Sequence, residues 1–187
     1  MGLFGWLKRG DHGSGEVKAW REQWTRAVES RDAAACDRLA AALQRQPPLA
    51  DDLEVEEEML EGLRQLLALD RELAAARLPV IDTTHRVVGA DRCHFSAPVS
   101  MPDDPSQPTG RLLLTSTRAV FAGGARTPAL PWHGTREIVQ SGRDLIFVFK
   151  RAGEEDGFRF RCNSFADALC GAAIARHLMR QPRGTQL

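Results

Sequence analysis

The spacing of hydrophobic positions changes near residue 79, from a helical repeat to alternation. Before that point apolar residues recur every three or four positions, which is typical of helices with one buried face. The pattern predicts helices over residues 16–30, over a segment that Asp32 caps and Pro47-Pro48 ends, and over residues 53–76.

After residue 79 the alternation of apolar and polar residues predicts a series of short strands. The clearest example is residues 110–121, where two apolar runs flank a polar turn at Ser116-Thr117. Clusters of Gly, Pro and Asp separate the runs, as in antiparallel meanders. Seven strands are expected, over residues 92–99, 110–115, 118–122, 127–131, 136–141, 144–150 and 157–162.

One amphipathic helix follows the last strand. Ser164 is a suitable N-cap, and Asp167 stands at the position that completes a capping box. The alanine-rich face of this helix suits close packing over the mouth of a barrel, where Phe165 and Leu169 are expected to fill the opening. The sequence therefore predicts an α+β fold, in which an N-terminal helical segment precedes a seven-stranded antiparallel β-barrel capped by a C-terminal helix.

This pattern divides the chain into an apolar tip and linker at 1–15, a helical region at 16–77, a barrel domain at 78–182 and a tail at 183–187. The tip carries four large apolar side chains followed directly by Lys8-Arg9. Such a segment can touch a membrane surface, enter the groove of a partner or pack on its own domain. The sequence leaves these alternatives open.

The charge balance argues against a nucleic-acid partner. The 187 residues carry 25 basic and 25 acidic side chains, so that no global field attracts a polyanion. No apolar run approaches the roughly 20 residues that cross a bilayer, and Lys8-Arg9 interrupts the N-terminal run before it can serve as a signal peptide. We expect a cytoplasmic protein.

Residues with catalytic or metal-binding chemistry are few and scattered. The four cysteines lack the close CxxC spacing of zinc sites, and Cys93 and His94 are neighbours on a strand, which point to opposite faces. The histidines show no partner spacing, and Gly123-Gly124 lies in a hairpin rather than before a helix, where a phosphate would bind. We expect no enzyme activity, metal, cofactor or small-molecule substrate.

Several short motifs after residue 85 belong together. They are Gly110-Arg111-Leu112-Leu113-Leu114-Thr115 with Arg118 and Phe121, then Leu130-Pro131-Trp132 with Ile138, then Phe158-Arg159-Phe160 before the last helix. With them, residues 85–180 resemble the pleckstrin-homology (PH) superfold, and in particular its GRAM and bacterial PH-like branch. The resemblance covers about half of the chain and implies a non-enzymatic binding module, which in eukaryotic relatives often binds phosphoinositides or protein partners.

A phosphoinositide site in this fold requires several Lys or Arg on the loops at the open end, because charge-assisted bonds must replace the hydration of the head group. Here those loops carry five carboxylates, among them Asp103 and Asp104, against Arg126, Lys150 and Arg151. Repulsion disfavours a polyphosphate. We therefore expect a protein-binding or self-associating adaptor. The alternative is a peripheral protein of the inner membrane face that binds anionic lipid through its apolar tip.

Ten residues are candidates for contact with a partner, because they are aromatic, apolar near the N-terminus, or basic on the expected loops. They are Leu3, Phe4, Trp6, Lys8, Arg9, Trp20, Trp24, Arg126, Trp132 and Arg151.

Overall fold

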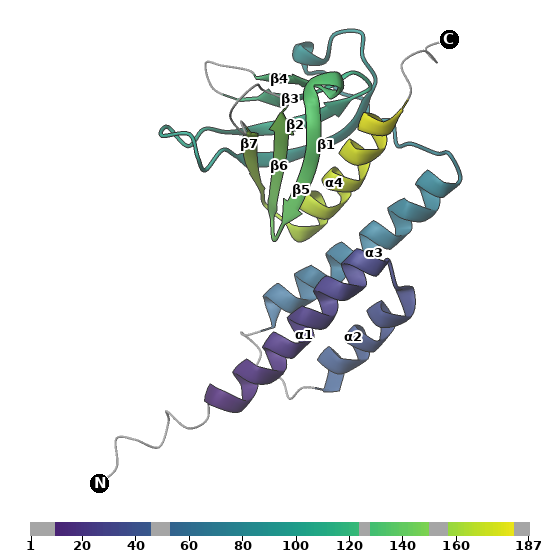
Figure 1. Ribbon diagram of the computed structural model, residues 1–187, viewed down its shortest axis with the longest axis vertical. Helices are drawn as coiled ribbons and strands as arrows, with labels where there is room; N and C mark the ends of the chain where they lie inside the picture. The colour runs from purple at the N-terminus through teal and green to yellow at the C-terminus, as the bar shows by residue number, and fades with distance from the viewer. Residues whose placement is uncertain (1–9, 46–52, 124–127, 150–156, 182–187) are drawn as a thin grey trace. The chain divides into compact units, whose positions relative to one another are not determined.

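The computed structural model describes residues 10–45, 53–123, 128–149 and 157–181, with side chains from residue 15 onward (Figure 1). The chain forms two compact units, residues 1–67 and residues 68–187. The division falls inside the third helix, before the boundary expected at residue 78.

The first unit contains helix α1 (Gly10–Ser30), helix α2 (Ala33–Arg45) and the first part of helix α3 (Glu54–Ala74). The three predicted helices are confirmed, but α1 begins at Gly10, where a Gly/Ser-rich linker was expected. A glycine inside a helix costs only about 1 kcal/mol relative to alanine, so helix formation is not prevented there. Asp32 caps α2 as expected, because its Oδ1 accepts a hydrogen bond of 3.0 Å from the N–H of Ala35.

The tryptophans of α1 join the three helices of this unit. The indole N–H of Trp20 donates to the carbonyl of Leu39 on α2 (3.1 Å), and that of Trp24 donates to the carbonyl of Met59 on α3 (2.7 Å). Both rings are buried, so each indole N–H needs such an acceptor. Arg21 adds an ion pair to the buried Glu56, with its Nε 2.7 Å from Oε1.

The second unit is built on seven antiparallel strands. They are β1 (Cys93–Ser100), β2 (Thr109–Thr115), β3 (Arg118–Ala122), β4 (Ala129–Pro131), β5 (Thr135–Ser141), β6 (Asp144–Phe149) and β7 (Gly157–Cys162), with short 3-10 helices at η1 (Arg86–Val88) and η2 (Trp132–Gly134). Their order in the sheet is β4-β3-β2-β1-β7-β6-β5. The α+β class and the seven strands are confirmed. The sheet does not close into a barrel, because β4 and β5 form its two ends.

Three phenylalanine rings form the centre of the core between the strands. The rings of Phe147 and Phe160 meet edge to face at 5.6 Å between centroids, and Phe121 lies 5.8 Å from Phe160. All three are fully buried. Such aromatic pairs stabilise a core beyond the area that they bury.

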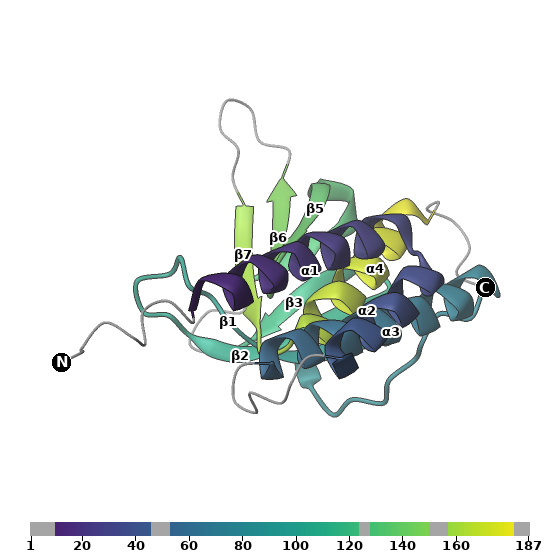
Figure 2. The same cartoon turned by 90° about the horizontal axis from the view of Figure 1, so that it is seen from below.

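Helix α4 (Phe165–Arg180) lies against the sheet (Figure 2). The predicted cap is confirmed, since the N–H of Asp167 donates to Ser164 Oγ at 3.0 Å. The expected role of Phe165 is corrected: its ring is half-buried and lies 5.0 Å from the guanidinium of Arg143, a cation–π contact. Leu169 is buried but does not belong to the core cluster of the sheet. The residues of α4 that do belong to it are Ala168, Ala172, Ile174, Ala175 and Leu178.

Two glycines let β2 and the end of β3 approach each other closely. A Cβ on Gly110 would lie 2.5 Å from the carbonyl oxygen of Ala122, and one on Gly123 would lie 2.6 Å from that of Thr109. These neighbours are backbone atoms of a paired ladder, so that they cannot move away without breaking it.

We expect Gly110→Ala to lower the free energy of unfolding by about 1–3 kcal/mol, because overpacking forces the two strands apart. Gly134→Ala is the matched control, since a Cβ there would have no atom within 4 Å. Chemical denaturation of both variants measures the difference. Equal stability of the two would show that the close approach is not needed.

Candidate functional site

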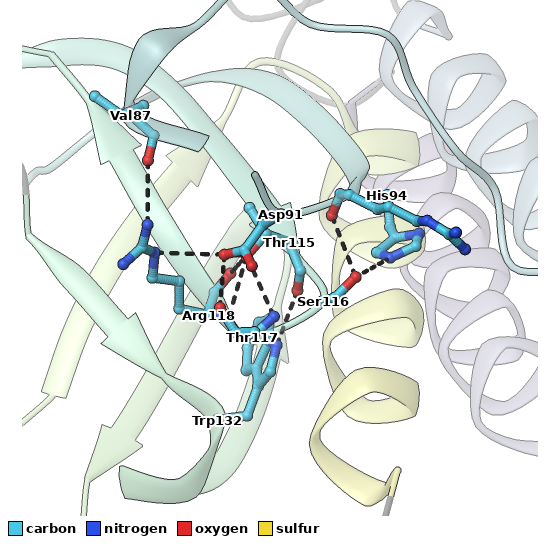
Figure 3. A network of polar contacts seen from close by, with 9 residues as sticks. Val87, Asp91, His94, Thr115, Ser116, Thr117, Arg118 and Trp132 are labelled. Atoms are coloured by element: carbon cyan, nitrogen blue, oxygen red, sulfur yellow. Dashed lines mark hydrogen bonds and ion pairs between the residues drawn. The ribbon is translucent and has the colours of Figure 1, made fainter. Parts of the chain in front are cut away.

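Polar side chains gather at the end of the sheet where η1, the start of β1 and the β2–β3 turn meet (Figure 3). The carboxylate of Asp91 lies at the centre. Its Oδ2 accepts a hydrogen bond from the hydroxyl of Thr117 (2.6 Å) and lies 3.8 Å from Nε of Arg118. The hydroxyl of Thr115 has two acceptors within reach, the carbonyl of Arg118 at 2.9 Å and Asp91 Oδ2 at 3.2 Å. Arg118 also donates to the carbonyl of Val87 in η1 (3.4 Å). The cluster therefore ties the loop before β1 to the turn.

The buried side chain of Thr115 stabilises the β2–β3 turn through hydrogen bonds. Its Oγ1 accepts from the backbone N–H groups of Thr117 (3.4 Å) and Arg118 (3.2 Å), and its carbonyl accepts from the indole N–H of Trp132 (2.9 Å). The side chain of Thr115 is fully buried, and in that position polar groups need these partners. The turn residues Ser116 and Thr117 are thus presented on a rigid support.

His94 connects this turn to the chain that precedes the sheet. Its Nε2 lies 2.9 Å from Ser116 Oγ and its Nδ1 lies 2.6 Å from the carbonyl oxygen of Pro79. The imidazole is buried between them. One side chain therefore fixes both the β2–β3 turn and the segment around Pro79.

The segment of residues 78–82, here called the flanking segment, runs beside the start of β1. The N–H of Ile81 donates to the carbonyl of Cys93 at 2.8 Å, forming a single antiparallel bridge. Successive residues of extended backbone direct their polar groups to opposite sides, so those of Val80 point away from β1. Within the described residues the backbone N–H and carbonyl of Val80 make no hydrogen bond to other backbone groups. The residues Val80 and Ile81 are 62% and 38% exposed.

Three of the ten candidate residues lie in the interior. Trp20, Trp24 and Trp132 are buried, and each donates its indole N–H to a backbone carbonyl. Their role is packing, so the structure corrects the expectation that these three contact a partner. The remaining candidates lie outside the described residues; they are Leu3, Phe4, Trp6, Lys8, Arg9, Arg126 and Arg151.

The loop between β1 and β2 also differs from its expected role as a repulsive rim. Asp103 pairs with Arg159 of β7, with 3.0 Å between Oδ1 and Nη2. Asp104 Oδ1 accepts from both the N–H and the hydroxyl of Ser106 (2.8 and 2.6 Å). The ion pair offsets part of the negative charge of Asp103, whereas the donors of Ser106 are neutral and leave the charge of Asp104 unchanged. Repulsion of a phosphate by this loop is therefore reduced at Asp103.

Three of the cysteines, Cys36, Cys93 and Cys162, are buried packing residues. Burial raises the pKa of the thiols of Cys36 and Cys93, and that of Cys162 to about 12. Since the thiolate is the nucleophile and the metal ligand, these three are unreactive at neutral pH. Among the residues that the structure describes, no group of three or more His, Cys, Asp or Glu could hold a metal ion.

We expect one of the four thiols to react readily with a disulfide reagent in the folded chain. Cys170 is half-buried, whereas the other three are buried. Titration with 5,5′-dithiobis(2-nitrobenzoate) should therefore release about one equivalent rapidly and the rest only on unfolding. Four fast equivalents without denaturant would contradict the buried placement.

The sequence indicated little of this site. Ser116 lies 22 residues after His94, and Asp91, His94 and Ser116 belong to the loop before β1, to β1 and to the β2–β3 turn. The local signals in the sequence are the polar turn at Ser116-Thr117 and the Val80-Ile81 pair, a short apolar run between Pro79 and Asp82.

Comparison with models of known protein families and with curated proteins returns no match for this sequence. Of the helices that the structure describes, none is both long and apolar enough to span a bilayer. The site must therefore be interpreted from its own geometry.

We expect Asp91→Ala to lower the free energy of unfolding by about 1–3 kcal/mol, because it leaves the hydroxyl of Thr117 and Nε of Arg118 without their shared acceptor. Asp82→Ala, at an exposed position near by, is the control and should change stability by less than about 0.5 kcal/mol. Thermal and chemical unfolding of both variants provide the comparison. Similar values for the two would mean that the cluster around Asp91 does not stabilise this end of the sheet.

Proposed function

We propose that this chain is a non-enzymatic, PH-like protein-binding module of the cytoplasm that self-associates through the flanking segment. The observation that carries the proposal is the consecutive exposure of Val80 and Ile81 on extended backbone with one unbonded edge. Exposed strand edges with apolar side chains are templates for pairing with another chain.

The support beneath the segment makes it suitable for binding. The bridge to Cys93 and the bond from His94 to Pro79 hold the backbone in place before a partner arrives. Holding a segment in its bound conformation reduces the entropy that association must overcome. A rigid edge is therefore a better docking element than a loop of the same composition.

The charge of the chain favours a second copy as the partner. Its formal net charge at pH 7 is zero, so like copies do not repel one another over a distance. The seven antiparallel strands followed by one helix support the PH-like assignment. The four free thiols fit a reducing compartment such as the cytoplasm.

Changing Val80 and Ile81 together to Asp tests the proposal. We expect sedimentation equilibrium of the full chain to show concentration-dependent association, and the double variant to weaken it about tenfold or more, because charges replace apolar contact area. Val55→Asp is the matched control, since Val55 is 41% exposed and lies on α3. It should associate like the parent.

Two results would count against self-association. One is a chain that stays monomeric at every concentration, and the other is equal association of the double variant and the parent. Sedimentation with vesicles that contain anionic lipid tests the membrane alternative on the same samples. Vesicle binding that deletion of residues 1–9 abolishes would favour that alternative.

A further inference from the structure

The carbonyl of Pro79 determines which nitrogen of His94 donates and which accepts a hydrogen bond. The carbonyl oxygen of Pro79 has no proton to give, so the ring nitrogen 2.6 Å away, Nδ1, must carry the hydrogen. In the neutral ring Nε2 then has a free lone pair. Ser116 Oγ, at 2.9 Å, donates its proton to that lone pair.

This arrangement is that of an activated hydroxyl. A serine is a weak nucleophile until an adjacent base takes its proton, and that base works best when a third group orients it. Here His94 is the base and the carbonyl of Pro79 is the group that orients it. The second acceptor within reach of the hydroxyl, the carbonyl of Arg92, lies farther away at 3.5 Å and competes weakly.

Ser116 is more exposed to solvent than His94, as a nucleophile with a shielded base requires. Ser116 is half-buried in the β2–β3 turn, whereas the residue His94 is only 5% exposed. Ser116 thus keeps part of its surface in solvent, while the base behind it is shielded from water. The neighbouring hydroxyl of Thr117 has a different environment, since it donates to the carboxylate of Asp91.

We propose that Ser116 is an acyl-acceptor site, modified by activated acyl donors of the ester or thioester class. In the step, Ser116 Oγ forms a bond to the carbonyl carbon of the donor while the bond from that carbon to the leaving oxygen or sulfur breaks. His94 Nε2 takes the serine proton and passes it to the leaving group. The products are an O-acyl serine and an alcohol or thiol, and no oxidant or reductant is needed.

Modification would also change the turn. An O-acyl serine has no hydroxyl proton, so it can no longer donate to His94 Nε2, and the imidazole keeps only its bond to Pro79. The acyl group would extend from the β2–β3 turn on the side where the hydroxyl is accessible. Acylation of Ser116 needs only the donor and this chain, so its test does not require a partner.

The full chain with p-nitrophenyl acetate, followed by peptide mass spectrometry, tests the proposal. We expect Ser116 to be acetylated on the order of 10²-fold faster than Ser96, because a positioned base contributes about that much. Ser96 is a suitable internal comparison, since its Oγ accepts a hydrogen bond from the guanidinium of Arg111, a cation that cannot take its proton. Ser116→Ala should remove the fast acetylation, and Ser96→Ala should leave it unchanged.

His94→Asn separates the base from the structural bond. Its side-chain amide can still donate to Pro79 but offers no base at the position of Nε2, so acetylation of Ser116 should fall to the rate of Ser96. Acetylation of Ser116 and Ser96 at equal rates in the parent chain would overturn the proposal. So would an unchanged rate in a folded His94→Asn variant. The first comparison uses the parent alone and decides the matter even where the variant does not fold.

Discussion

The close approach of α4 to the sheet is the constraint on which the second unit depends. Gly171 makes it possible, because a Cβ there would lie 2.9 Å from Leu145 Cδ1 and 3.1 Å from the ring of Phe95. The sheet has two unpaired ends and cannot close by strand pairing. The helix therefore covers the core, and Arg176 fastens it by donating twice to the carbonyl of Ile138 on end strand β5 (3.1 and 2.9 Å).

Hydrogen bonds and an ion pair, rather than apolar packing, hold the loop and turn at the start of β1. Asp91 and His94 each accept or donate on two sides, so the η1 loop, the β2–β3 turn and the flanking segment form one rigid end. Buried polar groups of this kind specify one arrangement because any other leaves them unpaired. An exposed apolar pair beside such a support is typical of a docking edge, and a serine backed by a fixed imidazole is typical of a reactive hydroxyl.

The tryptophans show why residue type alone is a weak guide to a binding surface. Trp20, Trp24 and Trp132 are large and amphipathic, which suits an interface as well as a core. Each indole N–H donates to a backbone carbonyl inside the fold, so that these groups are not available to a partner. Asp103 illustrates the same point for charge, because Arg159 from a distant strand neutralises it.

By itself the sequence determined the helices before residue 79, the seven strands, the Ser116-Thr117 turn and the Ser164 cap, because each depends on the spacing of neighbouring residues. It did not determine that the sheet stays open, that Phe165 lies beside Arg143, or that His94 stands between Pro79 and Ser116. Those features join residues that are far apart along the chain. Only the packing of the strands and α4 brings them within hydrogen-bond or ring-contact distance.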